Sequence, residues 1–480
     1  MRKTSREFLC LGCGIVLTAL GVILIPVFHH VIKSYITEKL PLKPGSMNYD
    51  AWITPPVPVF YYVWIFDLIN PKEVVESGEK PFVVQRGPFA YREHRRKHDI
   101  VFNDNATISY KERTWYEFVH NKSVGQESTT FWTVNLAMVT IASLIRSEYK
   151  WIRELTEIIL DAGGDSRLFQ KRTVKDILWG YEDPLLKKVN KFLKKYNKSI
   201  DEKIGIFYGQ NDTDNGVFTI YSGTSDISKF ALVDEWEGMR KLSYWTTDTC
   251  NMINGTDGTF FPPFIDKKDV LYTFCTDCCR SIYLTFNKLY VDRDIPLYSF
   301  MVPDELFGNT SANRGFCTPY GNCQPAGLLN VTVCRNAPIF LSQPHFLGAN
   351  TEVIHGVHGM NPTKGEHQTN IDVEPNTGIA LNVNKKLQIN VYIQNVSNIR
   401  DTALLDHIYY PVAWVNESAK MDDKIADQIQ SAIVTPIKTT LGVQYGLIII
   451  GGFLTLAVLV YIIVERIKAS GYKKIKPEKE

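Results

Sequence analysis

The chain has 480 residues, of which 45% are hydrophobic and 12% aromatic, and its formal net charge is only +2. This charge is too small for a general binder of nucleic acid or other polyanions, which needs a large excess of basic residues. The length allows one large domain or two ordinary ones.

Both ends of the chain carry long apolar runs. Residues 8–32 hold no charged side chain between Phe8 and Phe28, and a helix of that length crosses a hydrocarbon core of about 30 Å. Residues 443–464 form a second run of the same kind. A cleaved signal peptide is the alternative for the first run, but no small-residue cleavage site follows it. The sequence therefore predicts one transmembrane helix at each end.

The charges that flank these runs predict their orientation. Residues 1–7 carry a net charge of +2 and residues 465–480 one of +3, which leaves −3 for residues 8–464 because the total is +2. Positive flanks remain in the cytoplasm. We therefore predict two cytoplasmic tails and an ectodomain, residues 33–442, outside the cytosol. The expected location is the plasma membrane, and the alternative is the membrane of endosomes or lysosomes.

Glycosylation motifs support this topology. The Asn-x-Ser/Thr pattern occurs nine times, always between the two predicted spans, as a glycosylated lumenal domain requires. The predicted acceptors are Asn105, Asn121, Asn197, Asn211, Asn254, Asn309, Asn330, Asn395 and Asn416.

Seven cysteines lie in the predicted ectodomain, where an oxidising environment favours disulfides. Because seven is odd, at least one is free or bonds to another molecule. Cys317 and Cys323 flank a turn that contains proline, glycine and asparagine, which suits a local loop. Cys278 and Cys279 are adjacent and are not expected to bond to each other, because a vicinal bridge is strained.

Other cysteine chemistry is less favoured. A zinc site from Cys275-x-x-Cys278 with Cys317 or Cys323 fits the spacing, but the compartment argues against it. A nucleophilic cysteine would need a histidine base, and none is close in the sequence.

Most of the ectodomain is predicted to form β-strands. Residues 387–394 alternate apolar and polar side chains, which is typical of a half-buried strand. Residues 107–118 and 217–223 show the same pattern, and the continuous apolar run 57–66 indicates a strand buried on both faces. The basic stretch 91–98, YREHRRKH, is interpreted as a solvated edge strand rather than a binding site.

Residues 131–198 differ, because their spacing predicts helices over 136–147, 151–164 and 183–198. Asp183-Pro184 is a favourable start for the third helix. Six lysines line that helix, and they form either a solvated face or a cationic patch for an anionic ligand. They are Lys187, Lys188, Lys191, Lys194, Lys195 and Lys198.

Residues for catalysis are not evident. The chain lacks the common hydrolase, metalloprotease, phosphate-loop and dinucleotide-binding motifs. The best metal candidates are His355, His358, His367 and Asp372, but Asn-Pro and glycine indicate a loop whose histidines bond to the backbone. We expect no enzymatic activity, no cofactor and no metal site.

Six stretches follow the order found in one known family. They are NPKEVVESGEKPFVVQRGPFAYRE (70–93), ILWGYEDPL (177–185), CNMINGTDGTFFPPF (250–264), CRSIYLTF (279–286), PHFLGA (344–349) and GMNPTKGEHQTNIDVEPNTG (359–378). Together with both anchors they cover nearly the whole chain, which therefore resembles the class B scavenger receptors.

The resemblance implies a mixed α+β fold, in which a large antiparallel β-barrel ectodomain carries a helical bundle (131–198) at its membrane-distal apex. A largely apolar tunnel would lead through the barrel to the bilayer. The resemblance also implies the disulfides Cys279–Cys334 and Cys317–Cys323, and it leaves the partners of Cys250, Cys275 and Cys278 open.

Ligands would dock at the apex, where the candidate residues are Lys150, Trp151, Arg153, Glu154, Lys187, Lys188 and Lys191. Lys150 stands where a lysosomal member of the family has a histidine used in pH-dependent carriage, so the same switch is not expected. On the cytoplasmic side, Cys10 and Cys13 are candidates for S-acylation, with apolar packing as the alternative. Tyr472 and Ile475 form a tyrosine-based sorting pattern.

The expected function is that of a cell-surface receptor. It would bind lipid-carrying particles such as lipoproteins at the apex and pass lipid, cholesterol esters or fatty acids, to the membrane. The alternative is an endo-lysosomal receptor for protein cargo or for adhesion. Nucleic acid is not an expected partner, and the oligomeric state stays open, with a homo-oligomer among the alternatives.

Overall fold

The computed structural model of the chain describes residues 2–161, 167–194, 199–319, 321–335 and 337–473. They divide into two compact units. The smaller unit holds the residues up to Leu40, residues 293–295 and those from Asp423 onward. The larger unit holds residues 41–292 and 296–422.

The smaller unit contains two long helices, α1 (Arg2–Lys39) and α12 (Thr435–Lys473), the latter preceded by α11 (Asp423–Ile429). Both long helices are apolar enough to cross a membrane, as the sequence predicted. They pack on each other through small residues. A Cβ atom added at Gly14 would lie 2.8 Å from the backbone nitrogen of Thr455, and one at Gly451 would lie 2.6 Å from that of Thr18. Such close backbone contact is typical of packed transmembrane helices.

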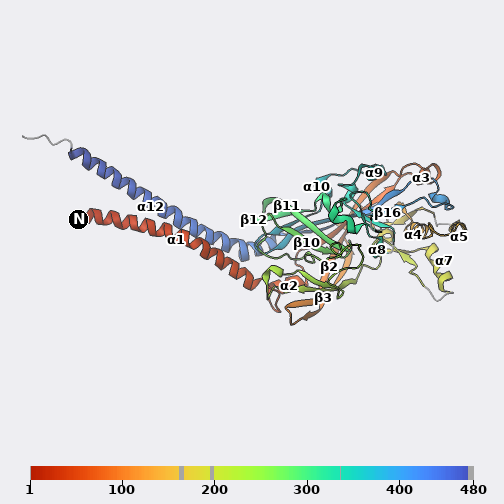
Figure 1. Cartoon of the computed structure of the whole chain (residues 1–480), viewed down its shortest axis with the longest axis horizontal. Helices are drawn as coiled ribbons and strands as arrows, with labels where there is room; N and C mark the ends of the chain where they lie inside the picture. Colours follow the sequence, from red (N-terminus) through yellow and green to blue (C-terminus); the bar gives the residue numbers. More distant parts are fainter. Residues whose placement is uncertain (1, 162–166, 195–198, 320, 336, 474–480) are drawn as a thin grey trace, which may run out of the picture. The chain divides into compact units, whose positions relative to one another are not determined.

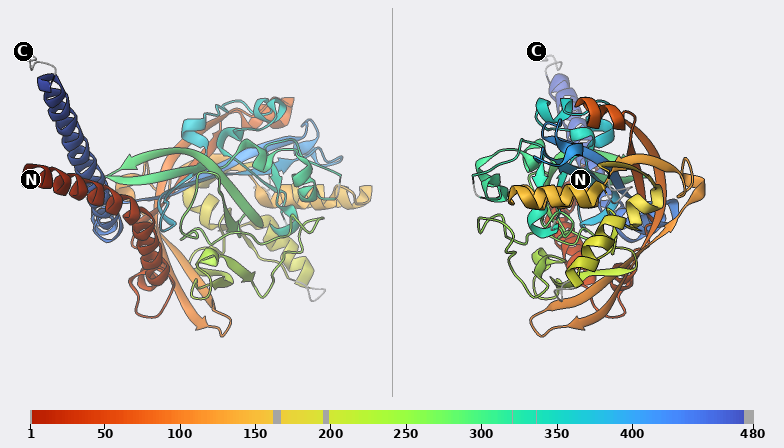
Figure 2. Two further views of the ribbon diagram at one scale, coloured as in Figure 1. Left: turned by 60° about the vertical axis from the view of Figure 1, so that its left-hand side comes forward. Right: turned by 90° about the vertical axis from the view of Figure 1, so that its right-hand side faces the viewer.

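The larger unit is built on a 13-stranded sheet, in the order β10-β11-β12-β15-β16-β17-β1-β2-β3-β8-β9, with β13 and β14 attached beside β16. The strands are β1 (Val59–Leu68), β2 (Val83–Phe102), β3 (Thr107–Phe118), β8 (Thr213–Tyr221), β9 (Val233–Trp236), β10 (Val270–Cys275), β11 (Arg280–Asp292), β12 (Ile295–Met301), β13 (Leu329–Asn330), β14 (Ile339–Ser342), β15 (Asn370–Glu374), β16 (Ile379–Ile393) and β17 (Ile408–Lys420). The central pairs from β15 to β9 are antiparallel. Figure 2 shows these strands curving around a common interior.

One short segment joins the two edges of this sheet. Thr256 bridges to Leu232, the residue before β9, and also to Thr273 of β10. Gly255 beside it requires glycine, because its φ is +88° and an added Cβ would lie 2.0 Å from the carbonyl oxygen of Tyr272. The sheet is therefore a nearly closed antiparallel barrel, and the predicted mixed α+β fold class is confirmed.

Two strand interpretations need correction. The interpretation of residues 91–98 as a solvated edge strand holds only in part. Residues 91–93 pair with both β1 and β3, whereas residues 94–98 pair with β3 alone, and Tyr91, Glu93 and Lys97 are buried rather than solvated. Residues 387–394 are not half-buried, because the polar Gln388 and Asn390 of β16 are as buried as their apolar neighbours. The side-chain amide of Asn390 donates to the carbonyl oxygen of Phe340 and to Ser342 on β14, the strand that pairs with β16 at this point.

Between β3 and β8 lies a segment of helices and short strands, residues 130–204, which we call the helical insertion. It contains β4 (Thr130–Val134), α4 (Leu136–Ile145), α5 (Lys150–Asp161), β5 (Phe169–Thr173), α6 (Val174–Trp179), β6 (Tyr181–Glu182), α7 (Pro184–Leu193) and β7 (Lys203–Ile204). Figure 1 shows α4, α5 and α7 gathered at one end of the larger unit.

Local sequence explains where these helices begin. The Asn135 side chain accepts a hydrogen bond from the backbone N–H of Met138 at the start of α4. Asp183 accepts two such bonds, from Leu185 and Leu186, at the start of α7, as the Asp-Pro pair predicted. The remaining helices of the larger unit are α2 (Met47–Ile53), α3 (Pro71–Ser77), α8 (Thr332–Arg335), α9 (Thr351–His355) and α10 (Lys364–His367).

Candidate ligand-binding surface and sheet interior

The helical insertion exposes several large apolar side chains. Tyr149 is 75% exposed and Trp151 is 63% exposed, and Leu144 and Ile158 are exposed to a similar degree. These residues come from the end of α4, the connection after it and α5. We call them the apolar tip. A soluble surface that groups such residues commonly marks a binding site.

The charged candidates on α5 are tied to their surroundings. Lys150 forms an ion pair with Glu154 one turn later, at 3.5 Å. The Nε atom of Arg153 donates to the carbonyl oxygen of Ser397 at 3.1 Å, which fixes α5 against the segment after β16. Trp151 lies between them in the sequence and exposes a large apolar ring, so it is the stronger candidate for contact with an apolar ligand.

The lysines of α7 are partly neutralised. Lys187 pairs with Glu182, and Lys194 pairs with Glu202 at 3.4 Å. Lys188 and Lys191 lie on the same helix, whereas Lys195 and Lys198 lie outside the described residues. Exposed pairs of this kind add little stability but lower the net positive charge. This favours the interpretation of α7 as a solvated face over that of a strong anion site.

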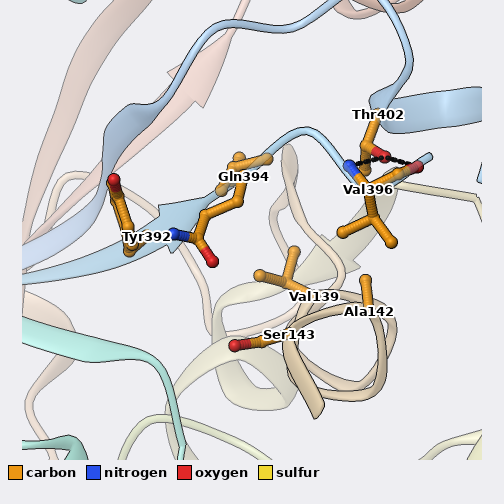
Figure 3. A pocket seen from close by; sticks show the side chains of 8 residues that line it. Val139, Ala142, Ser143, Tyr392, Gln394, Val396 and Thr402 are labelled. Atoms are coloured by element: carbon orange, nitrogen blue, oxygen red, sulfur yellow. Dashed lines mark hydrogen bonds between the residues drawn. The ribbon is translucent and has the colours of Figure 1, made fainter. Parts of the chain in front are cut away.

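A small pocket lies where α4 meets the end of β16 (Figure 3). Val139, Ala142 and Ser143 of α4 line it together with Tyr392, and Thr402 closes it while hydrogen-bonded to the backbone of Val396. Its free volume of about 10 Å³ has room for a single water molecule. This pocket cannot hold a lipid.

The inner face of the sheet carries a charged cluster that the sequence interpretation missed. Arg95 of β2 binds Glu93 on its own strand and Glu417 on β17. Lys385 of β16 also binds Glu417, at 3.2 Å. Lys385 and Glu417 are directly paired in the strand register, and so are Glu417 and Tyr61. We call the four residues Glu93, Arg95, Lys385 and Glu417 the polar belt.

A sequence signal for the belt exists within 91–98. Tyr91, Glu93, Arg95 and Lys97 fall at every second position and therefore share one face of β2. Lys97 continues the charged row inward, with its side chain fully buried between Glu112 and Asp257. The basic composition of the stretch hid this alternation, because the outward residues are also basic.

The two carboxyl groups of the polar belt, Glu93 and Glu417, have pKa values shifted in opposite directions. Burial raises the pKa of Glu93 to about 7; Arg95 opposes this rise, and the negative charge of Glu417 adds to it. Burial would also raise the pKa of Glu417, but Arg95 and Lys385 outweigh it and lower the pKa to about 2. Glu417 therefore stays ionised, whereas Glu93 titrates near neutral pH.

The histidines considered for a metal do not gather around one. His367 accepts a hydrogen bond from the backbone N–H of Thr363 at 2.9 Å, as expected for a histidine bonded to the backbone. The prediction of a loop was wrong for most of these residues, because His355 lies in α9, His367 in α10 and Asp372 in β15. His355 and His358 are exposed, whereas Asp372 accepts a hydrogen bond from Tyr290 at 2.7 Å. Among the described residues, no group of three or more His, Cys, Asp or Glu side chains could hold a metal ion.

The cysteines form three disulfides in the described part of the chain. Cys279 bonds to Cys334 and Cys317 to Cys323, which are the pairs that the resemblance implied. The third joins Cys275 to Cys278, a pairing that the sequence left open. Cys250 is buried with a free thiol that contacts the carbonyl oxygen of Ala312 at 3.5 Å. Cys10 and Cys13 are free and exposed on α1.

The predicted modification and sorting residues occupy varied positions. Asn105, Asn121, Asn211, Asn309 and Asn395 are exposed, and Asn254, Asn330 and Asn416 are partly buried. Asn197 and Ile475 lie outside the described residues, and Tyr472 falls in the last turn of α12. Their modification and sorting roles stay predictions.

Comparisons with known proteins match almost the whole chain. The family model described as the CD36 family matches residues 12–462. Scavenger receptor class B member 1 of Rattus norvegicus is 37% identical over 495 residues, which covers 100% of this chain and 95% of that protein. Lysosome membrane protein 2 of Mus musculus is 36% identical over 445 residues, 90% of this chain and 91% of that protein. The two terminal apolar helices fit a membrane protein with both ends in the cytoplasm.

Proposed function

Because the chain belongs to the CD36 family, we propose that it is a non-enzymatic cell-surface receptor for lipid-carrying particles. The helical insertion binds the particle, and lipid then moves along the inner face of the sheet toward the membrane. The observation that carries the proposal is the apolar tip, where Leu144, Tyr149, Trp151 and Ile158 stay exposed beside the cations of α5.

Burial of apolar surface would drive binding of the particle. Contact between the apolar tip and the surface of a lipid particle removes large side chains from water, worth about 25 cal/mol per Å². Aromatic residues that combine an apolar ring with a polar atom are well suited to such a boundary. The exposed amine of Lys150 nearby suits the phosphate groups that coat a lipid particle.

The test is uptake of a labelled cholesteryl ester or fatty acid by cells that express the protein. The double variant Tyr149→Ser and Trp151→Ser should reduce particle binding and uptake several-fold. Val124→Ser, an exposed apolar residue outside the helical insertion, is the matched control and should leave uptake unchanged. Surface expression is measured for all forms. Uptake at background level for the wild type, or equal uptake by the double variant, would refute the proposal.

A second candidate is an endo-lysosomal receptor for protein cargo. It is favoured by the 36% identity to lysosome membrane protein 2, almost the same as that to scavenger receptor class B member 1. In this case a sorting signal in the C-terminal tail should direct removal of the protein from the cell surface by endocytosis. Tyr472→Ala should then raise the surface fraction measured by antibody labelling, and unchanged trafficking would count against this candidate.

A further inference from the structure

Within the polar belt, Glu93 is buried and only one of its two carboxyl oxygens has a hydrogen-bond partner. Its side chain is only 2% exposed. One carboxyl oxygen, Oε1, accepts from the Nε atom of Arg95. The other oxygen, Oε2, is buried and has no hydrogen-bond partner. An ionised carboxylate with an unpaired oxygen in the protein interior is costly, whereas a proton on that oxygen removes the charge.

The charges around Glu93 point in the same direction. Glu417 binds both cations of the belt, Arg95 and Lys385, whereas Glu93 shares Arg95 alone. When a proton enters the belt, Glu93 is therefore the carboxylate that takes it.

Other groups face the belt from every strand around it. Tyr61 of β1 and Tyr116 of β3 lie within electrostatic reach of Glu93, and each has its pKa raised chiefly by burial. Asp277, in the turn between β10 and β11, acts on Lys385, and Glu112 of β3 acts on Arg95. Neither tyrosine is ionised in the physiological range, and the two added carboxylates make a second negative charge at Glu93 less favourable.

We propose that Glu93 is a proton-binding site inside the barrel, ionised at cell-surface pH and neutral in acidic compartments. Its protonation tightens the sheet around the belt. The closed arrangement, in which Glu93 is buried, holds a proton more firmly than any opened arrangement in which water reaches that carboxyl. Acid therefore favours the closed form, and neutral to basic pH favours opening.

Protons can reach the site without unfolding. The side chains of Arg95, Glu417 and Lys385 keep 23%, 15% and 37% of their surface exposed, so water contacts the belt around the buried Glu93. The belt also joins β2 to β17 across β1, through the contact of Arg95 with Glu417. Opening at Glu93 therefore loosens three neighbouring strands, which is where any lipid path along this face would have to pass.

Hydrogen exchange of the full chain in detergent tests the proposal at pH 8.0 and pH 5.5, with rates corrected for the intrinsic effect of pH. The wild type should exchange about ten-fold or more slowly at pH 5.5 in residues 92–96 and 414–418. Glu93→Gln, which is neutral at both pH values, should show almost no difference. Glu117→Gln, an exposed glutamate on β3, should behave like the wild type.

The variants separate Glu93 from the two histidines on the same strand. His94 and His98 remain in Glu93→Gln, so a pH effect that they cause would persist there. Equal corrected exchange of the wild type at both pH values would overturn the proposal, even if Glu93→Gln failed to fold. So would a full pH effect in a folded Glu93→Gln. The experiment uses no lipid, so its result is independent of the proposed transfer function.

Discussion

The imidazole ring of His345 lies against that of His367, with ring centroids 4.5 Å apart and planes inclined by 27°. The Nε2 atom of His345 is 2.6 Å from Oε1 of Gln85, and its Nδ1 accepts from the backbone N–H of Asn361 at 3.0 Å. Because Nδ1 is an acceptor, the neutral ring must carry its hydrogen on Nε2. Acid would have to protonate Nδ1 and break the bond to Asn361.

This pair predicts that acid removes the stability that His345 contributes to the fold. Burial, and then His367, lower the pKa of His345 from 6.5 to about 4. A histidine with a lowered pKa contributes stability that is present above pH 6.5 and lost as the pH falls toward 4. The loss should approach about 3 kcal/mol, at about 1.4 kcal/mol for each pKa unit.

The measurement is the thermal unfolding midpoint of the full chain in detergent between pH 7 and pH 4. His345→Asn should flatten its dependence on pH, because asparagine does not titrate and tolerates the φ of +54° at this position. His355→Asn, at an exposed histidine, is the control and should keep the wild-type slope. An unchanged slope in His345→Asn would contradict the prediction.

Lys97 should be the most sensitive charged position on β2. Its buried amine lies between Glu112 and Asp257, and Asp257 also accepts a hydrogen bond from Tyr110 at 2.7 Å. Lys97→Met would leave two carboxylates without their cation in the interior. We expect a loss of about 3–5 kcal/mol in the free energy of unfolding.

Denaturant unfolding measures this effect, and Lys111→Met is the matched control on the adjacent strand. Lys111 pairs with Asp99 at the surface, and such pairs contribute little. Similar stability losses for the two variants would show that burial of Lys97 does not matter.

The two disulfides that the resemblance implied should differ in their contribution to stability. Cys279–Cys334 closes a separation of 55 residues, whereas Cys317–Cys323 closes one of only 6. Loop-closure entropy then gives about 4 kcal/mol for the first and about 2 kcal/mol for the second. To test this order of stability, each cysteine pair is replaced with alanines and the unfolding midpoint is measured. A larger fall in the midpoint for Cys317–Cys323 than for Cys279–Cys334 would contradict the prediction.

The contact between the two long helices predicts a position-dependent effect of glycine replacement. Gly14→Val should force α1 away from Thr455 and cost about 1–3 kcal/mol, because an added Cβ has no space there. Gly12→Val is the control, since nothing lies within 4 Å of a Cβ at Gly12. Thermal unfolding of the full chain in detergent should separate the two variants, and equal midpoints would argue against this helix contact.

The sequence alone determined the features that depend on neighbouring residues. The apolar runs at both ends exceed the length of a bilayer core, so they predict spanning helices without further information. Alternation predicted residues 107–118 as a strand, and β3 has those same bounds. Asp183 predicted the start of α7 because capping involves only the next three residues.

Only the tertiary structure decided which distant segments pair with those helices and strands and bury their side chains. Periodicity shows which residues of 91–98 share a face, but not whether another strand buries that face. The partner of Arg95 is Glu417, more than three hundred positions away, and no local pattern pairs them. In the same way, β14 pairs with β16 along residues 388–391, and Thr256 joins both edges of the sheet. Burial and pairing between distant segments are properties of the folded chain, and the site depends on them.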